Sequence, residues 1–529
     1  MMDSVYVIGL DYGTDSARGL LVDALTGEEV ASSQFAFPRW AEGRYCNPQQ
    51  SQFRQHPLDA LEALEGLLKD LAAAAPEQWS NVKAINIDCT GCSPCLCDSH
   101  LKPLSLRKEF SECPAAMFFM WKDHSSQEES DRLQTALEGT SWLDTSGGKH
   151  SPESYWSKVA RALSECPELE RHAYAAVEMH DYLPAVLCGI TDYHELKESR
   201  ATIAAKAIWD CQSKEFPAVV TDVLPSVSGI FTNKNRKNYT ADAIQGYLCE
   251  EWASRTGLGR DVVVGVGHLD SWSGAVGAGV ARGRLVMNLG TSSAYIAVMP
   301  TGAVTKPIDG VLCQVEDLAV PGMTGFETGL SSFGDDYAWL KKILSWASGN
   351  EEGIMERLNR EAAGIVPSEN LPLSTDWFNG RRSPSTDMSV KAAISGLTLA
   401  TSPAELYYSI VESTAFATKA VVDLLAGNGV EISELVAIGG ISHKSPFVMQ
   451  MLSDVLQRPI RVSSCSQTCA YGAVLFATVN AGVYPDVTSA QNAICKTEEA
   501  VYTPRLEYSE ILTDRYGRYL ELGRRTGRV

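Results

Sequence analysis

The sequence predicts an α/β fold built from two related domains, and three observations support this prediction. Strand-like apolar runs alternate with amphipathic helical segments along the chain, which is typical of α/β proteins. The length of 529 residues exceeds what one hydrophobic core usually serves. A strand–turn–strand pattern near residue 10 is repeated near residue 287, which indicates that a second domain starts in the middle of the chain.

The repeated pattern consists of LDYGTDSARGLLVD near residue 10 and MNLGTSSAYIAVM near residue 287. The matched pairs are Asp11 with Asn288, Gly13 with Gly290, Thr14 with Thr291, Ser16 with Ser293 and Ala17 with Ala294. Tight turns of these residue types present N–H groups and hydroxyls that bind anionic oxygens. Ordinary hairpins use the same residues, so one copy is weak evidence. Two copies favour two turns that bind one polyphosphate.

The elements of the first half, residues 1–268, follow in order. VYVIGLDYG and SARGLLVD are the strands of the first hairpin, and helical periodicity begins at Pro57 in PLDALEALEGLLKDLAAAA. VKAINID is a strand and SSQEESDRLQTALEG a charged helix. We expect residues 151–187 to be largely helical and residues 199–239 to form irregular binding loops.

The pattern restarts near residue 262 with the buried-type strand DVVVGVGHLD, and on this basis we place the domain boundary near residue 268, with residues 269–529 as the second domain. The second hairpin precedes a long amphipathic helix that we expect to end at Gly427. The strand LVAIGG and a helix with Ser445 as N-cap and Pro446 in its first turn come next. A polar helix, LEYSEILTDRYGRYLELG, is the last element.

Composition limits the classes of partner. The net charge of -20 argues against nucleic acid or an anionic membrane as the main partner, because both need basic patches. No apolar run approaches the length that crosses a bilayer, and MMDSVYVIGLDYG is expected to be an opening strand instead of a signal peptide. The 14 cysteines are scattered, so we expect reduced thiols and a cytoplasmic location.

Four of these cysteines, Cys89, Cys92, Cys95 and Cys97, lie within nine residues. A Cys₄ zinc site usually needs two CxxC pairs separated by a longer loop. We therefore interpret the cluster as small apolar side chains of a strand and turn, and zinc binding stays the alternative.

Several motifs resemble the FGGY-type carbohydrate kinases, which belong to the superfamily of actin, sugar kinases and heat-shock ATPases. They are the two glycine-bearing turns, VAIGGISHKSPF and SGLTLATSPAELYYSIVESTAF. Within that family the chain is most similar to the L-ribulokinases, through RYCNPQQSQFRQHPLDALEALE, AMFFMWKDHSSQEE, PGMTGFETGLSSFGDDYAWLK and DWFNGRRSP. The resemblance extends from about residue 5 to about residue 523.

The resemblance implies two actin-like (ribonuclease H-like) ATPase domains with a cleft between them. Residues 1–268 would form the sugar side and residues 269–529 the ATP side. The implied reaction moves the γ-phosphoryl group of ATP to a sugar hydroxyl with Mg²⁺, and L-ribulose to L-ribulose 5-phosphate, in arabinose catabolism, is the expected case. A homodimer is expected from the family alone.

Asp270, in GVGHLDSW, is the base that the resemblance implies for the sugar hydroxyl. The residues support a special role independently, because an acid follows an apolar strand and a glycine-rich bend. The alternative is an Asp that caps the next helix.

Further site residues are implied by the resemblance on both sides. The substrate-binding set is Gly91, Asp123, Lys206, Asp270 and Glu327. The nucleotide-binding set is Thr14, Gly290, Thr291, Ser292, Gly439 and Gly440, with Asp11 for Mg²⁺. The alternatives are ordinary turn residues for the glycines, surface positions for Lys206 and Glu327, and packing for Trp121 beside Asp123.

Three positions depart from the usual family pattern, namely Ser125, Arg161 and Leu330, where the family often has arginine, tryptophan and glutamine. They bear on the identity of the sugar, because the loss of one hydrogen-bonding side chain can change preference by orders of magnitude. D-ribulose, xylulose or another polyol is therefore an alternative substrate. A non-catalytic sugar or nucleotide sensor on the same fold is the alternative of another class.

Overall fold

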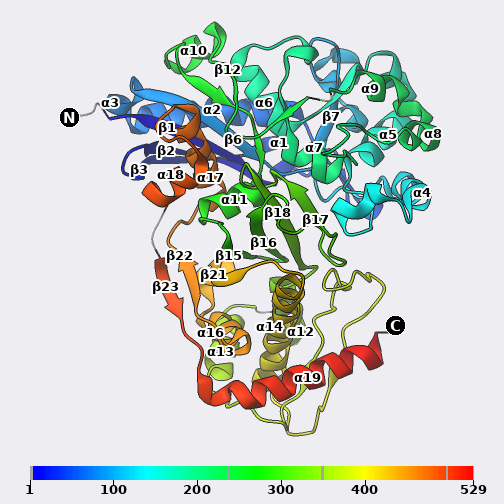
Figure 1. Ribbon diagram of the computed structural model, residues 1–529, viewed down its shortest axis with the longest axis vertical. Coiled ribbons are helices and arrows are strands. Elements are labelled where there is room, and N and C mark those ends of the chain that lie inside the picture. Colours follow the sequence, from blue (N-terminus) through cyan, green and yellow to red (C-terminus); the bar gives the residue numbers. More distant parts are fainter. Residues whose placement is uncertain (1–3, 236, 347–348, 350, 496–497, 528–529) are drawn as a thin grey trace. The chain divides into compact units, whose positions relative to one another are not determined.

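The computed structural model describes residues 4–235, 237–346, 349, 351–495 and 498–527. The chain divides into two compact units, each built around its own sheet (Figure 1). The first comprises Met1–Gly279, Gln314–Gly325 and Gln467–Cys495, and the second comprises Val280–Cys313, Phe326–Ser466 and Lys496–Val529. Strands and helices alternate in both, which confirms the α/β class. No described helix has the length and apolar character needed to cross a membrane.

The first unit has a mixed seven-stranded sheet in the order β12-β13-β6-β1-β2-β3, with β14 also paired to β6. The strands are β1 Tyr6–Tyr12, β2 Ser16–Asp23, β3 Glu29–Ala36, β6 Val82–Cys89, β12 Ile244–Tyr247, β13 Val263–Gly265 and β14 His268–Leu269. β1 and β2 form the predicted hairpin, and the parallel strands β13 and β14 pair with β6, which in turn pairs with β1. Apolar side chains cover these central strands and make the core of the unit.

Two helices distant in sequence pack together in the first unit. They are α11 (Asp270–Gly277) and α17 (Thr468–Asn480), and α17 also contacts β1 and β6. The contact between the helices is very close, because a Cβ at Gly472 would lie 1.9 Å from the carbonyl oxygen of Ser273.

The remaining helices of this unit are α1 Pro38–Ala41, α2 Pro57–Ala74, α3 Pro76–Trp79, α4 Gln127–Leu137, α5 Tyr155–Glu165, α6 Met179–Cys188, α7 Arg200–Lys206, α8 Val219–Val223, α9 Ser228–Asn233, α10 Glu250–Thr256 and α18 Val487–Ile494.

Most strands of the other large sheet, which has the order β17-β18-β16-β15-β21-β22-β23, belong to the second unit. The strands of this sheet are β15 Gly283–Leu289, β16 Ser293–Pro300, β17 Cys313–Glu316, β18 Met323–Leu330, β21 Ile432–Ile438, β22 Ile460–Ser463 and β23 Glu498–Tyr502. β15 and β16 form the second predicted hairpin, and β15 pairs in parallel with β21. The arrangement matches that of the first unit, where the hairpin strand β1 pairs in parallel with β6.

Helices pack around α14 (Pro403–Gly427), which ends at Gly427 as predicted. Its start is fixed by a capping box, in which Ser402 and Glu405 bond to each other's backbone N–H groups. The other helices of this unit are α12 Gly334–Ser345, α13 Ile354–Ala362, α15 Gly440–Lys444, α16 Pro446–Leu456 and α19 Ser509–Thr526. The fully buried Arg515 of α19 binds Glu412 of α14 through two nitrogens at 2.7 and 2.6 Å.

Small sheets complete the structure, and one of them interrupts a stretch that is largely helical as predicted. Residues 151–187 contain α5 and most of α6, and β9 (Ala175–Glu178) lies between these helices and pairs with β7 (Pro94–Cys97). The run AAVE has little local strand character, so its conformation depends on this distant partner. The other short strands are β4 Cys46–Asn47, β5 Gln52–Gln55, β8 Phe118–Phe119, β10 Glu198–Ser199, β11 Asn238–Tyr239, β19 Leu373–Ser374 and β20 Ile394–Ser395.

Two further expectations differ in detail from the structure. Residues 199–239 contain the short helices α7, α8 and α9 within the predicted irregular stretch. Ser445 is at the N-cap position of α16, but its hydroxyl donates to the Oδ1 atom of Asn359 at 2.8 Å and does not cap the helix.

Candidate functional site

Three carboxylates gather at one edge of the sheet in the first unit. Asp11 is on β1, and Asp88 is directly opposite it on the parallel strand β6. Asp270 follows β14, which pairs with β6 on the other side so that His268 lies opposite Asp88. The three acids therefore come from the carboxyl ends of neighbouring parallel strands, where ligand sites of α/β sheets commonly lie.

Asp11 is buried and accepts a hydrogen bond from the Nη1 atom of Arg18 at 3.3 Å. Burial raises the pKa of Asp11, and the positive charge of Arg18 opposes this shift. Arg18, which lies on β2, therefore compensates part of the cost of burying this acid.

Asp88 is the residue of this group that the sequence analysis missed. It is fully buried, and neither carboxylate oxygen makes a hydrogen bond of normal geometry with the described residues. Burial, and next the negative charges of Asp11 and Asp270, raise the pKa of Asp88 well above its ordinary value. The sequence carried one signal for it, because VKAINID ends in an acid as the first strand does.

Asp270 is the first residue of α11 and is partly buried. Its Oδ1 atom accepts the backbone N–H of Ser271 at 2.7 Å. Leu269 occupies the N-cap position of α11, so Asp270 is not the cap of the helix, and this hydrogen bond instead fixes its carboxylate at the first helical residue. Its negative charge acts on Asp88 and Cys89.

The acids fit Mg²⁺ in their chemistry. Mg²⁺ prefers hard oxygen ligands and usually takes one or two protein carboxylates together with water and phosphate oxygens. Asp11 offers such a carboxylate at the end of a strand, and the unbonded oxygens of Asp88 lie in the same group. Within the described residues, no three His, Cys, Asp or Glu side chains form a group that could hold a metal by themselves.

Two of the predicted sugar residues lie close to this edge. A Cβ at Gly91 would lie 2.5 Å from the Cδ1 atom of Leu269, the residue before Asp270, so a larger residue after β6 would have to displace that side chain. Lys206 ends α7, which packs on β14, and its charge acts on Cys92 next to Gly91. Lys206 is half-buried, in contrast to the solvated surface position that was its alternative.

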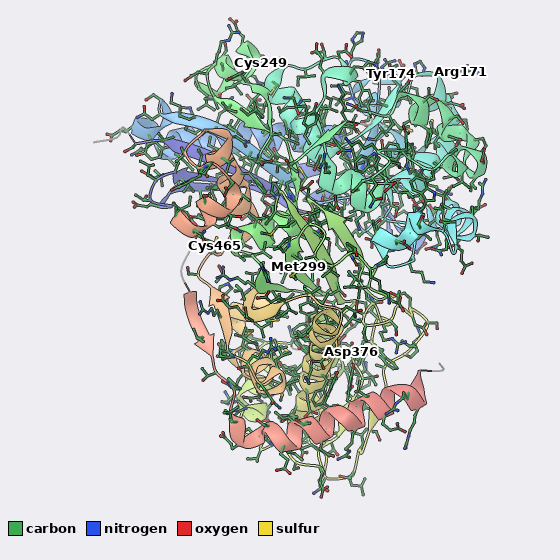
Figure 2. All side chains as sticks on the ribbon, viewed as in Figure 1. Arg171, Tyr174, Cys249, Met299, Asp376 and Cys465 are labelled. Carbon is green, nitrogen blue, oxygen red and sulfur yellow. The ribbon has the colours of Figure 1, made fainter. Side chains whose placement is uncertain are left out.

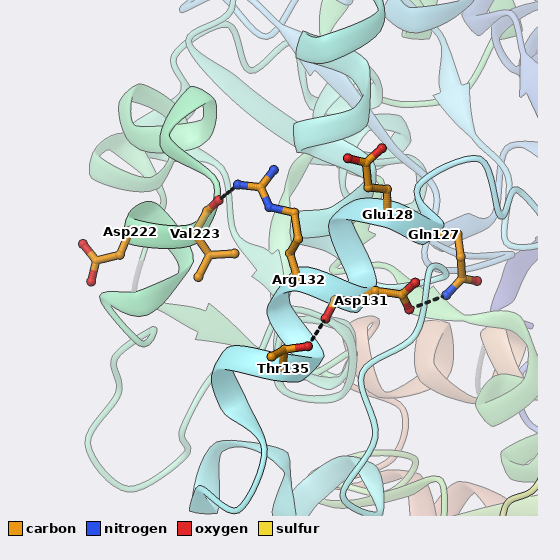
Figure 3. Close-up of a pocket in the computed structure, with 7 residues that line it drawn as sticks. All are labelled: Gln127, Glu128, Asp131, Arg132, Thr135, Asp222 and Val223. Atoms are coloured by element: carbon orange, nitrogen blue, oxygen red, sulfur yellow. Dashed lines mark hydrogen bonds between the residues drawn. The ribbon is translucent and has the colours of Figure 1, made fainter.

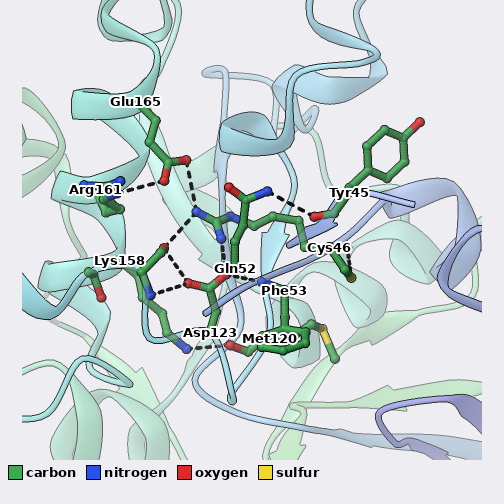
Figure 4. A network of polar contacts seen from close by, with 12 residues as sticks. Tyr45, Cys46, Gln52, Phe53, Met120, Asp123, Lys158, Arg161 and Glu165 are labelled. Carbon is green, nitrogen blue, oxygen red and sulfur yellow. Dashed lines mark hydrogen bonds and ion pairs between the residues drawn. The ribbon is translucent and has the colours of Figure 1, made fainter. Parts of the chain in front are cut away.

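Asp123 is part of a buried polar network, which Figure 4 shows. It is fully buried and forms an ion pair with Arg54, whose side chain is also fully buried. Its oxygens also accept the backbone N–H of Phe53 at 2.6 Å and the hydroxyl of Ser125 at 2.6 Å. These contacts occupy Asp123, so the geometry gives no support to its predicted contact with a polyol.

The first turn is connected to the segment that precedes Asp123. The indole Nε1 atom of Trp121 donates to the hydroxyl of Thr14 at 3.0 Å. Trp121 is 37% exposed, so it does more than pack in the core. This hydrogen bond orients a residue predicted to contact phosphate or Mg²⁺.

The second unit brings together the predicted nucleotide residues. The turn of Gly290, Thr291 and Ser292 is closed by a bond from the Gly290 N–H to the Ser292 carbonyl at 3.0 Å. The start of α12 lies on this turn, because Gly334 donates to Gly290 at 3.0 Å and Phe333 to Thr291 at 2.7 Å.

Gly439 and Gly440 follow the neighbouring strand β21, whose last residue, Ile438, lies opposite Asn288. Gly439 has a φ of +92°, and a Cβ there would lie 2.7 Å from the Oδ1 atom of Asn288, so both conformation and space require glycine. Apart from its chain neighbours and the backbone of its own helix, no described atom lies within 4 Å of a Cβ built at Gly440. The start of α15, whose first residue is Gly440, therefore has open space beside it.

Glu327 lies on β18 and is half-buried. Its backbone carbonyl accepts the N–H of Leu312 at 2.8 Å. Because Glu327 belongs to the second unit, its predicted sugar contact stays a prediction.

The cysteine cluster is internal. Cys95 and Cys97 lie on one face of β7 with their sulfurs 3.7 Å apart, whereas the thiol of Cys92 donates to Glu178 at 2.6 Å. All 14 cysteines are free thiols.

One pocket lies at the surface of the first unit (Figure 3). It has a volume of about 830 Å³ between α4 and α8 and is lined by Gln127, Glu128, Asp131, Arg132, Thr135, Asp222 and Val223. Arg132 donates to the carbonyl of Val223 across it. None of the predicted site residues lines this pocket.

Comparison with known proteins adds two family matches. Residues 6–277 match the N-terminal domain and residues 285–481 the C-terminal domain of the FGGY family of carbohydrate kinases. A ribulokinase of Vibrio parahaemolyticus is 36% identical over 540 residues, which cover 98% of this chain and 95% of the relative. A ribulokinase of Geobacillus thermodenitrificans is 32% identical over 544 residues, with 98% and 94% covered.

Solved structures share the fold at lower identity. The xylulose kinase of Rhodospirillum rubrum superposes with a TM-score of 0.82 at 20% identity, with 98% of each chain covered. A glycerol kinase of Plasmodium falciparum with ADP superposes with a TM-score of 0.82 at 15% identity, with 99% of this chain and 98% of that chain covered.

Proposed function

Because this chain belongs to the FGGY family of carbohydrate kinases, we propose that it phosphorylates a ketopentose with ATP, and that L-ribulose is the substrate and L-ribulose 5-phosphate the product. The observation that carries the choice of sugar is the 36% identity to a ribulokinase over 98% of the chain. The gathering of Asp270 with Asp11 and Asp88 at one sheet edge supports phosphoryl transfer, which needs a base and a metal-binding acid.

In this proposal each unit has its own task. In the first, the Asp270 carboxylate accepts the proton of the sugar hydroxyl, while Lys206 and the backbone at Gly91 orient the sugar. In the second, the N–H groups and hydroxyls of the 290–292 turn, with Gly439 and Gly440, hold the phosphates and adenosine of ATP. Glu327 adds a sugar contact.

Asp11 would hold Mg²⁺, and Thr14 would bind a phosphate or a water molecule beside it. When bound, Mg²⁺ would neutralise the charge that develops on the transferred phosphoryl group. The hydrogen bond from Arg18 orients the Asp11 carboxylate for this role.

The proposed location is the cytoplasm, and the free thiols of all 14 cysteines support it. The proposed partners are small molecules, the sugar and ATP, and the net charge of -20 supports neither nucleic acid nor an anionic membrane as a partner.

A panel of L-ribulose, D-ribulose, xylulose and simple polyols in an ADP-release assay tests the proposal. We expect the highest kcat/KM with L-ribulose. The Asp270→Asn variant should lose turnover by about 10²- to 10⁴-fold, as expected for loss of a general base, while it still binds the sugar. If kcat/KM is higher with xylulose than with L-ribulose, xylulose becomes the proposed substrate. If the Asp270→Asn variant keeps full activity, Asp270 is not the general base. Sugar binding without any turnover in the wild-type protein would favour a sensor.

A further inference from the structure

Lys158 is a buried cation that the proposed reaction does not use. It lies on α5, is fully buried, and forms no ion pair with the described residues. Its Nζ atom instead donates to three backbone carbonyls, those of Cys92 at 2.7 Å, Met120 at 2.8 Å and Trp121 at 3.5 Å. Figure 4 shows Lys158 beside Met120, next to the network of Asp123.

Burial of an ammonium group is unfavourable unless hydrogen bonds replace its hydration. Burial indeed lowers the pKa of Lys158, and the more distant negative charges, among them those of Asp123 and Glu178, oppose this shift. All three acceptors of Lys158 among the described residues are backbone carbonyls, so its hydrogen bonds constrain the chain path of two segments. A leucine or methionine would fill the same space without that constraint.

The two segments both carry residues of the candidate site. The first is the turn after β6, in which Gly91 precedes Cys92. The second is the segment 120–121, in which Trp121 donates to Thr14. One ammonium group therefore connects the backbone beside the proposed sugar contact to the residue that orients the first glycine turn.

Glu178, at the end of β9, holds the first segment through other atoms. Its carboxylate accepts the thiol of Cys92 at 2.6 Å and the backbone N–H of Ser93 at 2.6 Å. Lys158 binds the carbonyl of Cys92, so the peptide group between Cys92 and Ser93 is fixed through its oxygen by Lys158 and through its own N–H by Glu178. Such double fixation is needed where a backbone group must meet a ligand at one position.

We propose that Lys158 is a positioning residue for the sugar site, which sets the backbone of residues 91–93 and 120–121 by donating to their carbonyls. The inference rests on the proposed function through the sugar contact at Gly91. It gives Lys158 no contact with substrate.

The test replaces Lys158 by methionine, which keeps the length of the side chain and removes the donors. We expect kcat/KM for the sugar to fall on the order of 10²-fold, because a displacement of about 1 Å in a site has that effect, while the Kd of ADP changes by less than about threefold. Amide hydrogen exchange should become faster at residues 91–93 and 120–123. This second measurement does not require turnover.

Leu67→Ala is the matched control for general loss of stability. Leu67 is buried on α2 in the same unit, and α2 packs on β2 and β3. We expect this variant to melt earlier but to keep the sugar kcat/KM. If Lys158→Met keeps both the sugar kcat/KM and the exchange rates, or if Leu67→Ala lowers kcat/KM equally, the proposal is wrong.

If the methionine variant does not fold, the same measurements are made on Lys158→Gln, since its amide retains a donor for one carbonyl. If neither variant folds, Lys158 is required for folding and the proposal is overturned. If the wild-type protein prefers another sugar, only the substrate proposal fails, and the same variants are measured with that sugar. If it phosphorylates none, hydrogen exchange alone decides whether Lys158 sets the two segments.

Discussion

Asp336 provides the sharpest test of the electrostatics of the second unit. It lies in the first turn of α12, is fully buried, and neither carboxylate oxygen has a hydrogen-bond partner of normal geometry among the described residues. Asp376, labelled in Figure 2, is a second buried acid that acts on it. Burial raises the pKa of Asp336 to about 8. We predict that Asp336→Asn stabilises the protein near neutral pH.

The sign follows from proton linkage. The folded state binds the Asp336 proton more tightly than the unfolded state, where the pKa has its ordinary value of 3.8. This contribution to stability is therefore complete below about pH 4 and is lost as the pH rises towards 8. At about 1.4 kcal/mol per pH unit, the wild-type protein has lost about 4 kcal/mol at pH 7. Asparagine removes the ionisation and with it this loss.

Thermal melting of the two proteins between pH 4 and pH 8 measures the effect. With about 2–4 °C per kcal/mol, the variant should melt on the order of 10 °C higher at pH 7 and at nearly the same temperature at pH 4. Asp335→Asn is the matched control, because Asp335 is the exposed neighbour and its replacement removes the same charge. Equal melting temperatures of wild type and Asp336→Asn across the range would refute the reasoning.

Two further predictions concern packing and ion pairs. Arg515→Met should destabilise the second unit by about 3–5 kcal/mol in chemical denaturation, because it leaves the Glu412 carboxylate buried without its partner. Adding Glu412→Gln to that variant should restore part of the loss, and a double variant no more stable than the single one would contradict this. Gly472→Ala should lower the melting temperature, because its Cβ would overlap the Ser273 carbonyl. Gly517→Ala in α19, with open space around it, should raise it slightly, and equal effects of the two alanines would be inconsistent with the close helix contact.

The sequence was sufficient for features that depend on neighbouring residues. The two hairpins, the end of α14 at Gly427 and the positions of Asp11 and Asp270 at strand ends follow from local patterns of apolar residues, glycines and acids. Asp88 was within reach of the same reasoning. It ends the predicted strand VKAINID, in a position similar to that of Asp11 in the first strand.

The buried contacts of Asp123 and Lys158 could not be predicted from local patterns. The motif WKDH does not show that Arg54, a residue 69 positions away, approaches Asp123. The helix containing Lys158 does not show which carbonyls its ammonium group meets. In both cases the side chain is buried against segments distant in the sequence, and the local sequence does not indicate which segments these are.

The sequence by itself determined the α/β class, the repeated turns and the family to which the chain belongs, since these depend on short-range periodicity and contiguous motifs. Only the tertiary structure decided that residues 467–495 belong to the first unit, where α17 packs on α11 and β1. It also placed β6 between the strands that carry Asp11 and precede Asp270. Strand order and helix docking are set by the burial of surfaces far apart along the chain, and such contacts leave no periodic signal in either partner.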